Sequence, residues 1–238
     1  MIEVLRRLGY YPRFCVWELT LACDMRCRHC GSFAGRPRER ELDTEEALSV
    51  ARQLADMRCE RLTLSGGEPT LRPDWDRIAQ ALTSRKVRTN VITNGWSWSP
   101  EHTRRAIGAG LENVAFSLDG PESAHDTVRA KPGSYARVMA AIDDCVAAGL
   151  PASVVTHINA LNARSLREFR QTLHEHGVSS WQIQMGNPAG TMGEHRELVL
   201  APEELLWLVP EIAAIRTEHP RRPKVFVADN VGYYGRYE

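Results

Sequence analysis

The sequence lacks any long apolar segment. None of its 238 residues falls in a run approaching the roughly 20 apolar residues that a membrane-spanning helix needs. The first twelve residues carry charges and have no apolar core of the kind found in secretory signal peptides. We therefore expect a cytoplasmic protein with no membrane partner, whose cysteines are reduced.

Aromatic residues and excess charge are also scarce. Aromatic residues make up 7% of the chain, and the tryptophans are too scattered to predict a platform that stacks nucleobases. Thirty Lys and Arg residues balance 30 Asp and Glu residues, so no overall field attracts nucleic acid, and we expect no such partner. The 43% of hydrophobic residues and 25% of charged residues are ordinary for one large globular domain and exclude a disordered chain.

Predicted strands and helices alternate along the chain. Short apolar runs predict strands at residues 13–20, 61–65, 87–93, 113–118, 152–157, 180–185 and 224–228. Amphipathic patterns predict helices that begin at Asp43, Pro73, Pro100, Ser134, Asn162 and Pro202, with Asp43, Ser134 and Asn162 as caps and Pro73 near a first turn. Such alternation predicts parallel strands with helices outside. Six strand–helix units fall short of a closed eightfold barrel, so we expect an α/β fold, a partial (β/α)6 TIM-like barrel.

Three cysteines follow the first predicted strand. Cys23, Cys27 and Cys30 have the spacing C-x3-C-x2-C, and functional side chains gather at the carboxyl ends of strands in such folds. Three thiolates do not complete a tetrahedral zinc site, and His29 as a fourth ligand would strain the loop. On a four-iron cluster they would hold three irons and leave the fourth open to a substrate or cofactor.

Two other functions agree with these cysteines. One is an iron–sulfur electron-transfer or sensor protein, and the other is a zinc-stabilised structural domain. The remaining cysteines, Cys15, Cys59 and Cys145, are far apart in the sequence, and we expect them to be small buried hydrophobes and not ligands.

The segment WELTLACDMRCRHC resembles the cluster-binding loop of the radical S-adenosylmethionine (SAM) superfamily. Gly66-Gly67-Glu68-Pro69 resembles the glycine-rich SAM-binding turn of that family. The segments TNG at 93–95 and SLDG at 117–120 stand where its third and fourth strands end. The segment from His125 to Tyr135 resembles the subgroup that modifies peptides, the SPASM type. The resemblance covers roughly residues 13–190.

The resemblance implies a role for each matching residue. Cys23, Cys27 and Cys30 would hold three irons of a 4Fe-4S cluster, and SAM would chelate the fourth. The other residues would surround SAM: His29 near the adenine, Gly66 and Gly67 along the methionine part, Glu68 at its ammonium group, Ser117 at the ribose or the carboxylate, Arg129 at the carboxylate, and Asn94 and Asn159 near the ribose or the sulfonium. No general acid or base is implied.

The implied function is that of a radical SAM enzyme. Such an enzyme cleaves SAM reductively to a 5′-deoxyadenosyl radical, which abstracts hydrogen from a peptide or a small-molecule substrate. Reduced flavodoxin or ferredoxin would be the electron donor.

The implied domain organisation has three parts. Residues 1–12 would be a lead-in, residues 13–217 the radical SAM core domain, and residues 218–238 a C-terminal strand and tail. Peptide-modifying relatives continue into a cysteine-rich extension, whereas no cysteine follows Cys145 here. We therefore expect a core fragment, or an unusually short member, of a longer enzyme type, whose tyrosine-containing tail leads into a missing extension.

Overall fold

The described residues, which are 7, 9, 11–218, 222–228, 231 and 237 in the computed structural model, form one sheet of seven parallel strands. The strands are β1 (Phe14–Thr20), β2 (Arg61–Gly66), β3 (Arg88–Thr93), β4 (Asn113–Ser117), β5 (Ala152–Ile158), β6 (Ser180–Met185) and β7 (Lys224–Val227). Their order in the sheet follows the chain, which leaves β1 and β7 at the two edges. This arrangement confirms the predicted partial barrel of parallel strands.

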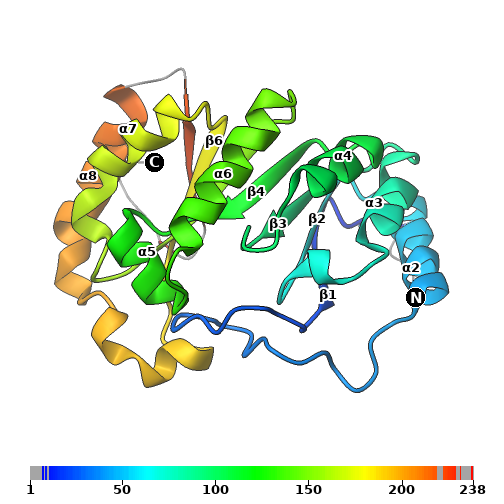
Figure 1. Ribbon diagram of the computed structural model, residues 1–238, viewed down its shortest axis with the longest axis horizontal. Coiled ribbons are helices and arrows are strands. Elements are labelled where there is room, and N and C mark those ends of the chain that lie inside the picture. The colour runs from blue at the N-terminus through cyan, green and yellow to red at the C-terminus, as the bar shows by residue number, and fades with distance from the viewer. Residues whose placement is uncertain are drawn as a thin grey trace.

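Helices cover the outside of the curved sheet (Figure 1). They run from α2 (Thr44–Asp56) and α3 (Trp75–Thr83) on one flank through α4 (Pro100–Gly108) and α6 (Ser134–Ala147) to α7 (Leu166–Glu175) and α8 (Leu205–Glu218) on the other. A shorter helix, α5 (Glu122–Arg129), follows β4. One 3-10 turn precedes α7, and three 3-10 segments lie between β6 and α8. The segment between β1 and α2, blue in Figure 1, crosses beneath the sheet toward α5 before it returns to α2.

Alternation along each strand separates an apolar outer face from a polar inner face. On β2, Leu62 and Leu64 are fully buried beneath the helices. Between them Thr63 points the other way and donates a hydrogen bond to Asn90 Oδ1 at 2.7 Å. Hydrogen bonds of this kind between neighbouring strands make the inside of the barrel hydrophilic, so the core that stabilises the fold lies between the sheet and its helices.

Two predicted helix starts are wrong in detail. The helix expected from Pro73 begins at Trp75 with Asp74 at its N-cap, so Pro73 lies near the first turn, as predicted, but outside the helix. Ser134 is the first residue of α6 and not its cap, because Gly133 with φ of 80° occupies the N-cap. The side chain of Asp126, on α5, accepts hydrogen bonds from the backbone N–H groups of Gly133 and Tyr135 instead. The capping group therefore comes from the preceding helix, which the sequence pattern did not predict.

Asn162 likewise does not cap the helix that follows it. Its side chain accepts a hydrogen bond from the Asn159 N–H and donates to the carbonyls of Asp119 and His157. Asn162 therefore ties the end of β5 to the end of β4. By contrast, Asp43 and Glu46 form the predicted capping box at the start of α2.

The end of the chain is described only in part. β7 pairs in parallel with β6, as a seventh strand of the same sheet. In the predicted tail, Tyr233 and Tyr234 lie outside the described residues, whereas Tyr237 is described and half-buried. Among the described residues, no helix has both the length and the apolar character needed to cross a membrane.

Candidate functional site

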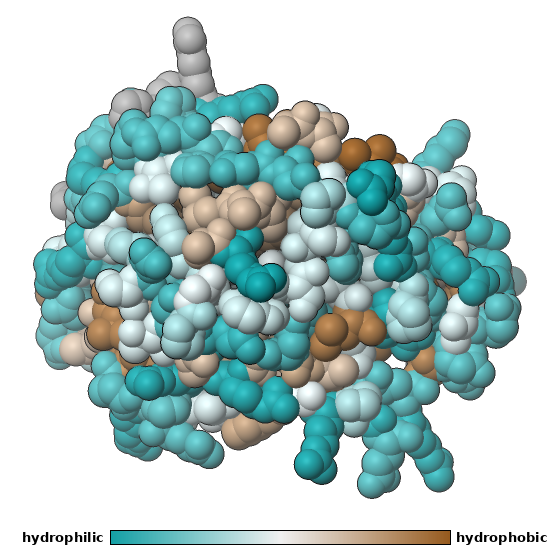
Figure 2. Space-filling model, in the orientation of Figure 1, coloured by the Kyte–Doolittle hydropathy of each residue, from teal (hydrophilic) through white to brown (hydrophobic). Residues whose placement is uncertain are grey.

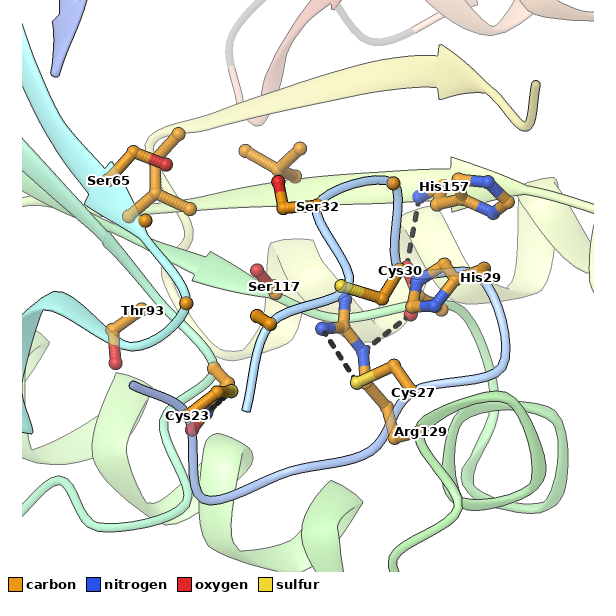
Figure 3. Close-up of a pocket in the computed structure, with 18 of the residues that line it drawn as sticks. Cys23, Cys27, His29, Cys30, Ser32, Ser65, Thr93, Ser117, Arg129 and His157 are labelled. Carbon is orange, nitrogen blue, oxygen red and sulfur yellow. Dashed lines mark hydrogen bonds and ion pairs between the residues drawn. The ribbon is translucent and has the colours of Figure 1, made fainter. Parts of the chain in front are cut away.

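A cavity of about 230 Å³ opens at the carboxyl ends of the strands (Figure 3). Segments that are distant in sequence meet around it, among them the cysteine loop after β1, the glycine turn after β2, and the ends of β3 to β5. Nine of the predicted site residues line it: Cys23, Cys27, His29, Cys30, Gly66, Gly67, Asn94, Ser117 and Arg129. The predicted residues Glu68 and Asn159 do not.

The cysteine loop is held in place by backbone hydrogen bonds at several points. The Arg28 N–H donates to the carbonyl of Val128 on α5 at 2.8 Å, and the Gly35 N–H donates to the Leu21 carbonyl at 2.8 Å. The Arg26 guanidinium donates to the carbonyls of Cys23 and Met25 within the loop. The loop therefore presents its thiols to the cavity from a fixed backbone.

The three thiols are free and partly or fully buried. Burial raises the pKa of Cys23 to about 11 and also raises the pKa of Cys27, where the nearby Arg129 opposes the rise. A cationic metal centre would reverse this effect, because it binds the thiolate form. In the described part of the chain, no three His, Cys, Asp or Glu side chains converge closely enough to hold a single metal ion. Three separate thiols around one open cavity suit a cluster with one cysteine per iron.

The glycine turn packs directly on the start of the cysteine loop. The Gly67 N–H donates to the Thr20 carbonyl, and the Glu68 N–H donates to the Ala22 carbonyl, both at 2.7 Å. A Cβ atom on Gly67 would lie 2.3 Å from the Ala22 carbonyl oxygen, and Gly66 has φ of 144°, where side chains are strained. Glycine is therefore required here by contact between the two loops, whatever binds in the cavity.

Glu68 is fully buried, and its carboxylate turns into the protein. It accepts hydrogen bonds from Thr93 Oγ1 at 2.9 Å, from the Asn94 N–H at 2.7 Å, and from both the N–H and the hydroxyl of Thr70. Burial raises the pKa of this carboxyl, and the four donors oppose the rise. Glu68 thus joins the glycine turn to the end of β3, and its contact with SAM stays a prediction.

Asp119, at the end of β4, is the centre of a buried polar network, although it was not among the predicted site residues. Its Oδ2 atom accepts from Arg129 Nε at 2.7 Å and lies 3.1 Å from His29 Nε2, and its Oδ1 accepts from the His157 N–H at 2.9 Å. Burial alone would raise the pKa of Asp119, but the Arg129 guanidinium and the His29 imidazole hold it well below its usual range. The sequence signals for this residue were its position at a strand end and its place in the SLDG segment of the family resemblance.

Arg129 connects this network to the cysteines. Besides its bond to Asp119, its Nη1 atom lies 3.9 Å from Cys27 Sγ (Figure 3). Asn94 makes a similar contact on the other side, where its Nδ2 lies 3.8 Å from Cys23 Sγ and donates to Asp24 Oδ1 at 2.7 Å. Two side chains with N–H donors therefore flank two of the three thiols.

The remaining predicted residues are placed as follows. His29 packs its ring edge-on against the ring of His157, with ring centres 4.4 Å apart. Asn159 is fully buried and bonds within its own loop, where it accepts from the Leu161 N–H. The other three cysteines, Cys15, Cys59 and Cys145, pack in or against the hydrophobic core and do not line the cavity.

The comparisons with known proteins agree with this geometry. The Radical SAM superfamily profile matches residues 17–176. An AdoMet-dependent heme synthase from Methanosarcina barkeri is 31% identical over 81% of this chain and 56% of its own length. The sporulation killing factor maturation protein SkfB from Bacillus subtilis is 31% identical over 65% of this chain and 38% of its own length.

Solved structures show the same fold. The crystal structure of Streptococcus suis SuiB bound to the precursor peptide SuiA has a TM-score of 0.81 at 14% identity, over 95% of this chain and 51% of that one. This chain thus spans about half the length of SuiB and of the heme synthase. The relatives include the maturation protein SkfB and the mycofactocin maturase MftC, and SuiB is solved with a precursor peptide, which confirms the predicted resemblance to the peptide-modifying subgroup. Because the superfamily profile matches most of its length, this chain belongs to the radical SAM superfamily.

Proposed function

We propose that this chain holds a 4Fe-4S cluster on Cys23, Cys27 and Cys30, binds SAM beside it, and removes hydrogen from a peptide or small-molecule substrate. The observation that carries the proposal is the meeting of these thiols and the Gly66-Gly67 turn on one cavity. When bound, a reduced cluster supplies one electron to the sulfonium of SAM, which separates into methionine and a 5′-deoxyadenosyl radical able to abstract hydrogen.

The residues of the chain bind and orient the cofactor. Arg129 is held by Asp119 with an N–H group toward Cys27, where it would stabilise a thiolate ligand and the carboxylate of SAM. Ser117, Asn94 and the backbone of the glycine turn would supply polar contacts to the rest of SAM. In the described part of the chain, Nδ1 of His29 and Nδ1 of His157 have no partner, and both residues line the cavity. A polar group of a bound ligand would satisfy these two nitrogens.

Two features favour this function over the two alternatives. A structural zinc site needs four converging ligands, and the described residues hold no such group. An electron-transfer protein needs no cavity beside its cluster, whereas here the cavity extends from the thiols to Ser117 and His157. The relative named as a heme synthase supports a small-molecule substrate, and SuiB, solved with a precursor peptide, supports a peptide substrate. Reduced flavodoxin or ferredoxin as the electron donor is part of the proposal.

The test is anaerobic reconstitution followed by iron and sulfide analysis and an assay for 5′-deoxyadenosine with dithionite as the reductant. We expect about four irons per chain and SAM-dependent formation of 5′-deoxyadenosine. Replacing Cys23, Cys27 and Cys30 with alanine should abolish both. The matched control replaces Cys15, Cys59 and Cys145, which should leave iron content unchanged in the folded protein. Equal iron in the two triple variants would refute the assignment.

A further inference from the structure

An exposed cationic surface lies beside the cysteine loop, outside the cavity. At its centre is Trp96, half-buried in the loop after β3. Lys131 Nζ lies 4.4 Å from the centre of the Trp96 ring, and Arg137 Cζ lies 4.6 Å from it. We call these three residues the Trp96 patch. None of them lines the cavity, so a partner bound here would leave the cavity open.

The two cations of the patch are not neutralised by acidic neighbours. Among the described residues, neither Lys131 nor Arg137 has a carboxylate within ion-pair distance. The nearby carboxylates have other partners: Asp24 accepts from Asn94 and Ser97, and Asp126 accepts from the start of α6. The ring holds the two cations in place by cation–π contact, which leaves their charge available to a partner.

The patch is also connected to one of the three cysteines. The Trp96 N–H donates to Asn94 Oδ1 at 2.8 Å, and Asn94 Nδ2 lies 3.8 Å from Cys23 Sγ. The Asn94 side chain therefore bridges the backbone of Trp96 and a predicted cluster ligand. Electron transfer is faster along a short path of covalent and hydrogen bonds than across an empty gap of the same length.

We infer that the Trp96 patch is the docking surface for a small acidic electron-transfer protein of the flavodoxin class. The inference rests on the proposed function, in which the metal centre of this chain must be reduced. In each transfer the reduced donor loses one electron and the metal centre gains it. An acidic partner is attracted by unpaired cations, which mainly raise its association rate and fix its orientation. Tryptophan and arginine are also the residues that most often dominate binding at the centre of an interface.

The molecule presents at least one mostly hydrophilic face, on which hydrophobic side chains form small separate patches (Figure 2). Transient electron-transfer complexes bury little area and depend on charge, whereas permanent interfaces are larger and more apolar.

The test measures binding of oxidised flavodoxin to the reconstituted protein by isothermal titration calorimetry. Lys131→Glu with Arg137→Glu should raise Kd at least about tenfold, and the wild-type Kd should rise with salt. The matched control is Arg52→Glu with Arg85→Glu, two exposed cations on α2 and next to α3, which should change Kd by less than about twofold. An unchanged Kd in the patch variant, or an equal loss in the control, would overturn the inference.

A second measurement separates this inference from the proposed function. We expect flavodoxin hydroquinone to reduce the cluster of the patch variant about tenfold more slowly than that of the wild type, while dithionite reduces both at one rate. A wild type that forms no 5′-deoxyadenosine with dithionite would refute the proposed function. If flavodoxin reduced both proteins at the same rate, the docking surface would be refuted and the proposed function would still stand.

Discussion

The guanidinium of Arg129 makes two interactions at once. Its Nε atom binds the buried Asp119, and its Nη1 atom approaches Cys27 Sγ. Removing the charge would leave Asp119 without its main cationic partner, which makes alanine a poor probe because buried unpaired charges destabilise proteins strongly. Lysine keeps the charge but not the fork of donors.

We predict that Arg129→Lys folds and keeps its iron, binds SAM about ten- to a hundredfold more weakly, and has a more negative cluster potential. The affinity falls because a charge-assisted hydrogen bond contributes about 1.5–3 kcal/mol, and the potential falls because hydrogen bonds to sulfur favour the reduced cluster. Anaerobic titration and a redox titration followed by electron paramagnetic resonance measure the two effects. If Arg129→Lys kept the wild-type affinity for SAM and the wild-type cluster potential, the role of Arg129 would be purely structural.

His125 makes the stability of the fold depend on pH. Its Nδ1 accepts a hydrogen bond from the Asp119 N–H at 3.0 Å, which requires a neutral ring, and burial lowers its pKa from 6.5 to about 4. A pKa that is lower in the folded state means that folding favours the neutral form. The resulting stability is present above about pH 6.5 and is lost as the pH falls toward about 4.

We predict that His125→Asn reduces this dependence, because the Asn side-chain oxygen replaces the acceptor without titrating. Between about pH 7.5 and about pH 5.5, the free energy of unfolding should fall by roughly 1 kcal/mol more in the wild type than in the variant. Urea denaturation of the cluster-free proteins at the two pH values measures the difference. Parallel pH profiles would show that His125 does not contribute.

At the scale of elements, the site depends on contact between two loops. The glycine turn after β2 is hydrogen-bonded to residues 20 and 22, where the chain leaves β1 and enters the cysteine loop. The cysteines are thus positioned by the neighbouring strand, and a disturbance of the turn is transmitted to them.

We predict that Gly67→Ala destabilises the protein by roughly 1–3 kcal/mol and lowers its iron content after reconstitution, because the new Cβ would overlap a backbone carbonyl. Gly108→Ala is the control, since nothing lies within 4 Å of a Cβ at that position at the end of α4. Its stability should be unchanged or raised by up to about 1 kcal/mol. Urea denaturation and iron analysis of both variants test the difference, and equal behaviour would contradict the loop-contact argument.

At the scale of the whole molecule, the cavity exists only when the sheet is formed. Its lining comes from the cysteine loop after β1, from α5, and from β2 to β6 with residues that follow them, so the unfolded chain offers no equivalent site. A ligand that binds only the folded state stabilises it by mass action.

We predict that SAM at about a hundred times its Kd stabilises the reconstituted protein by about 2.7 kcal/mol, or roughly 5–10 °C in Tm for a chain of this length. The variant without Cys23, Cys27 and Cys30 should show little or no shift, because SAM would lack its metal partner. Anaerobic thermal denaturation with and without SAM measures the shift. A similar shift in both proteins would mean that SAM binds without the cluster.

The sequence alone determined the order of the strands and of the longer helices, though not the short helix α5, and the position of the cysteine motif. Strand and helix patterns depend on the spacing of apolar residues over short distances, so they can be seen in one chain without its partners. The capping box at Asp43 and Glu46 is equally local. The family resemblance of the cysteine loop and glycine turn was visible for the same reason, because each motif is continuous in sequence.

Only the tertiary structure decided which groups meet. Asp126 rather than Ser134 caps α6, and Asn162 joins two strands, because donors and acceptors that are distant in sequence become neighbours on folding. The carboxylate of Glu68 turns away from the cavity because four donors from two strand ends surround it. The network around Asp119 draws its members from four separate segments, and no local pattern reveals such a juxtaposition. A sequence shows which chemistry is available near each strand end, whereas the packing of the loops determines which of those groups face the ligand.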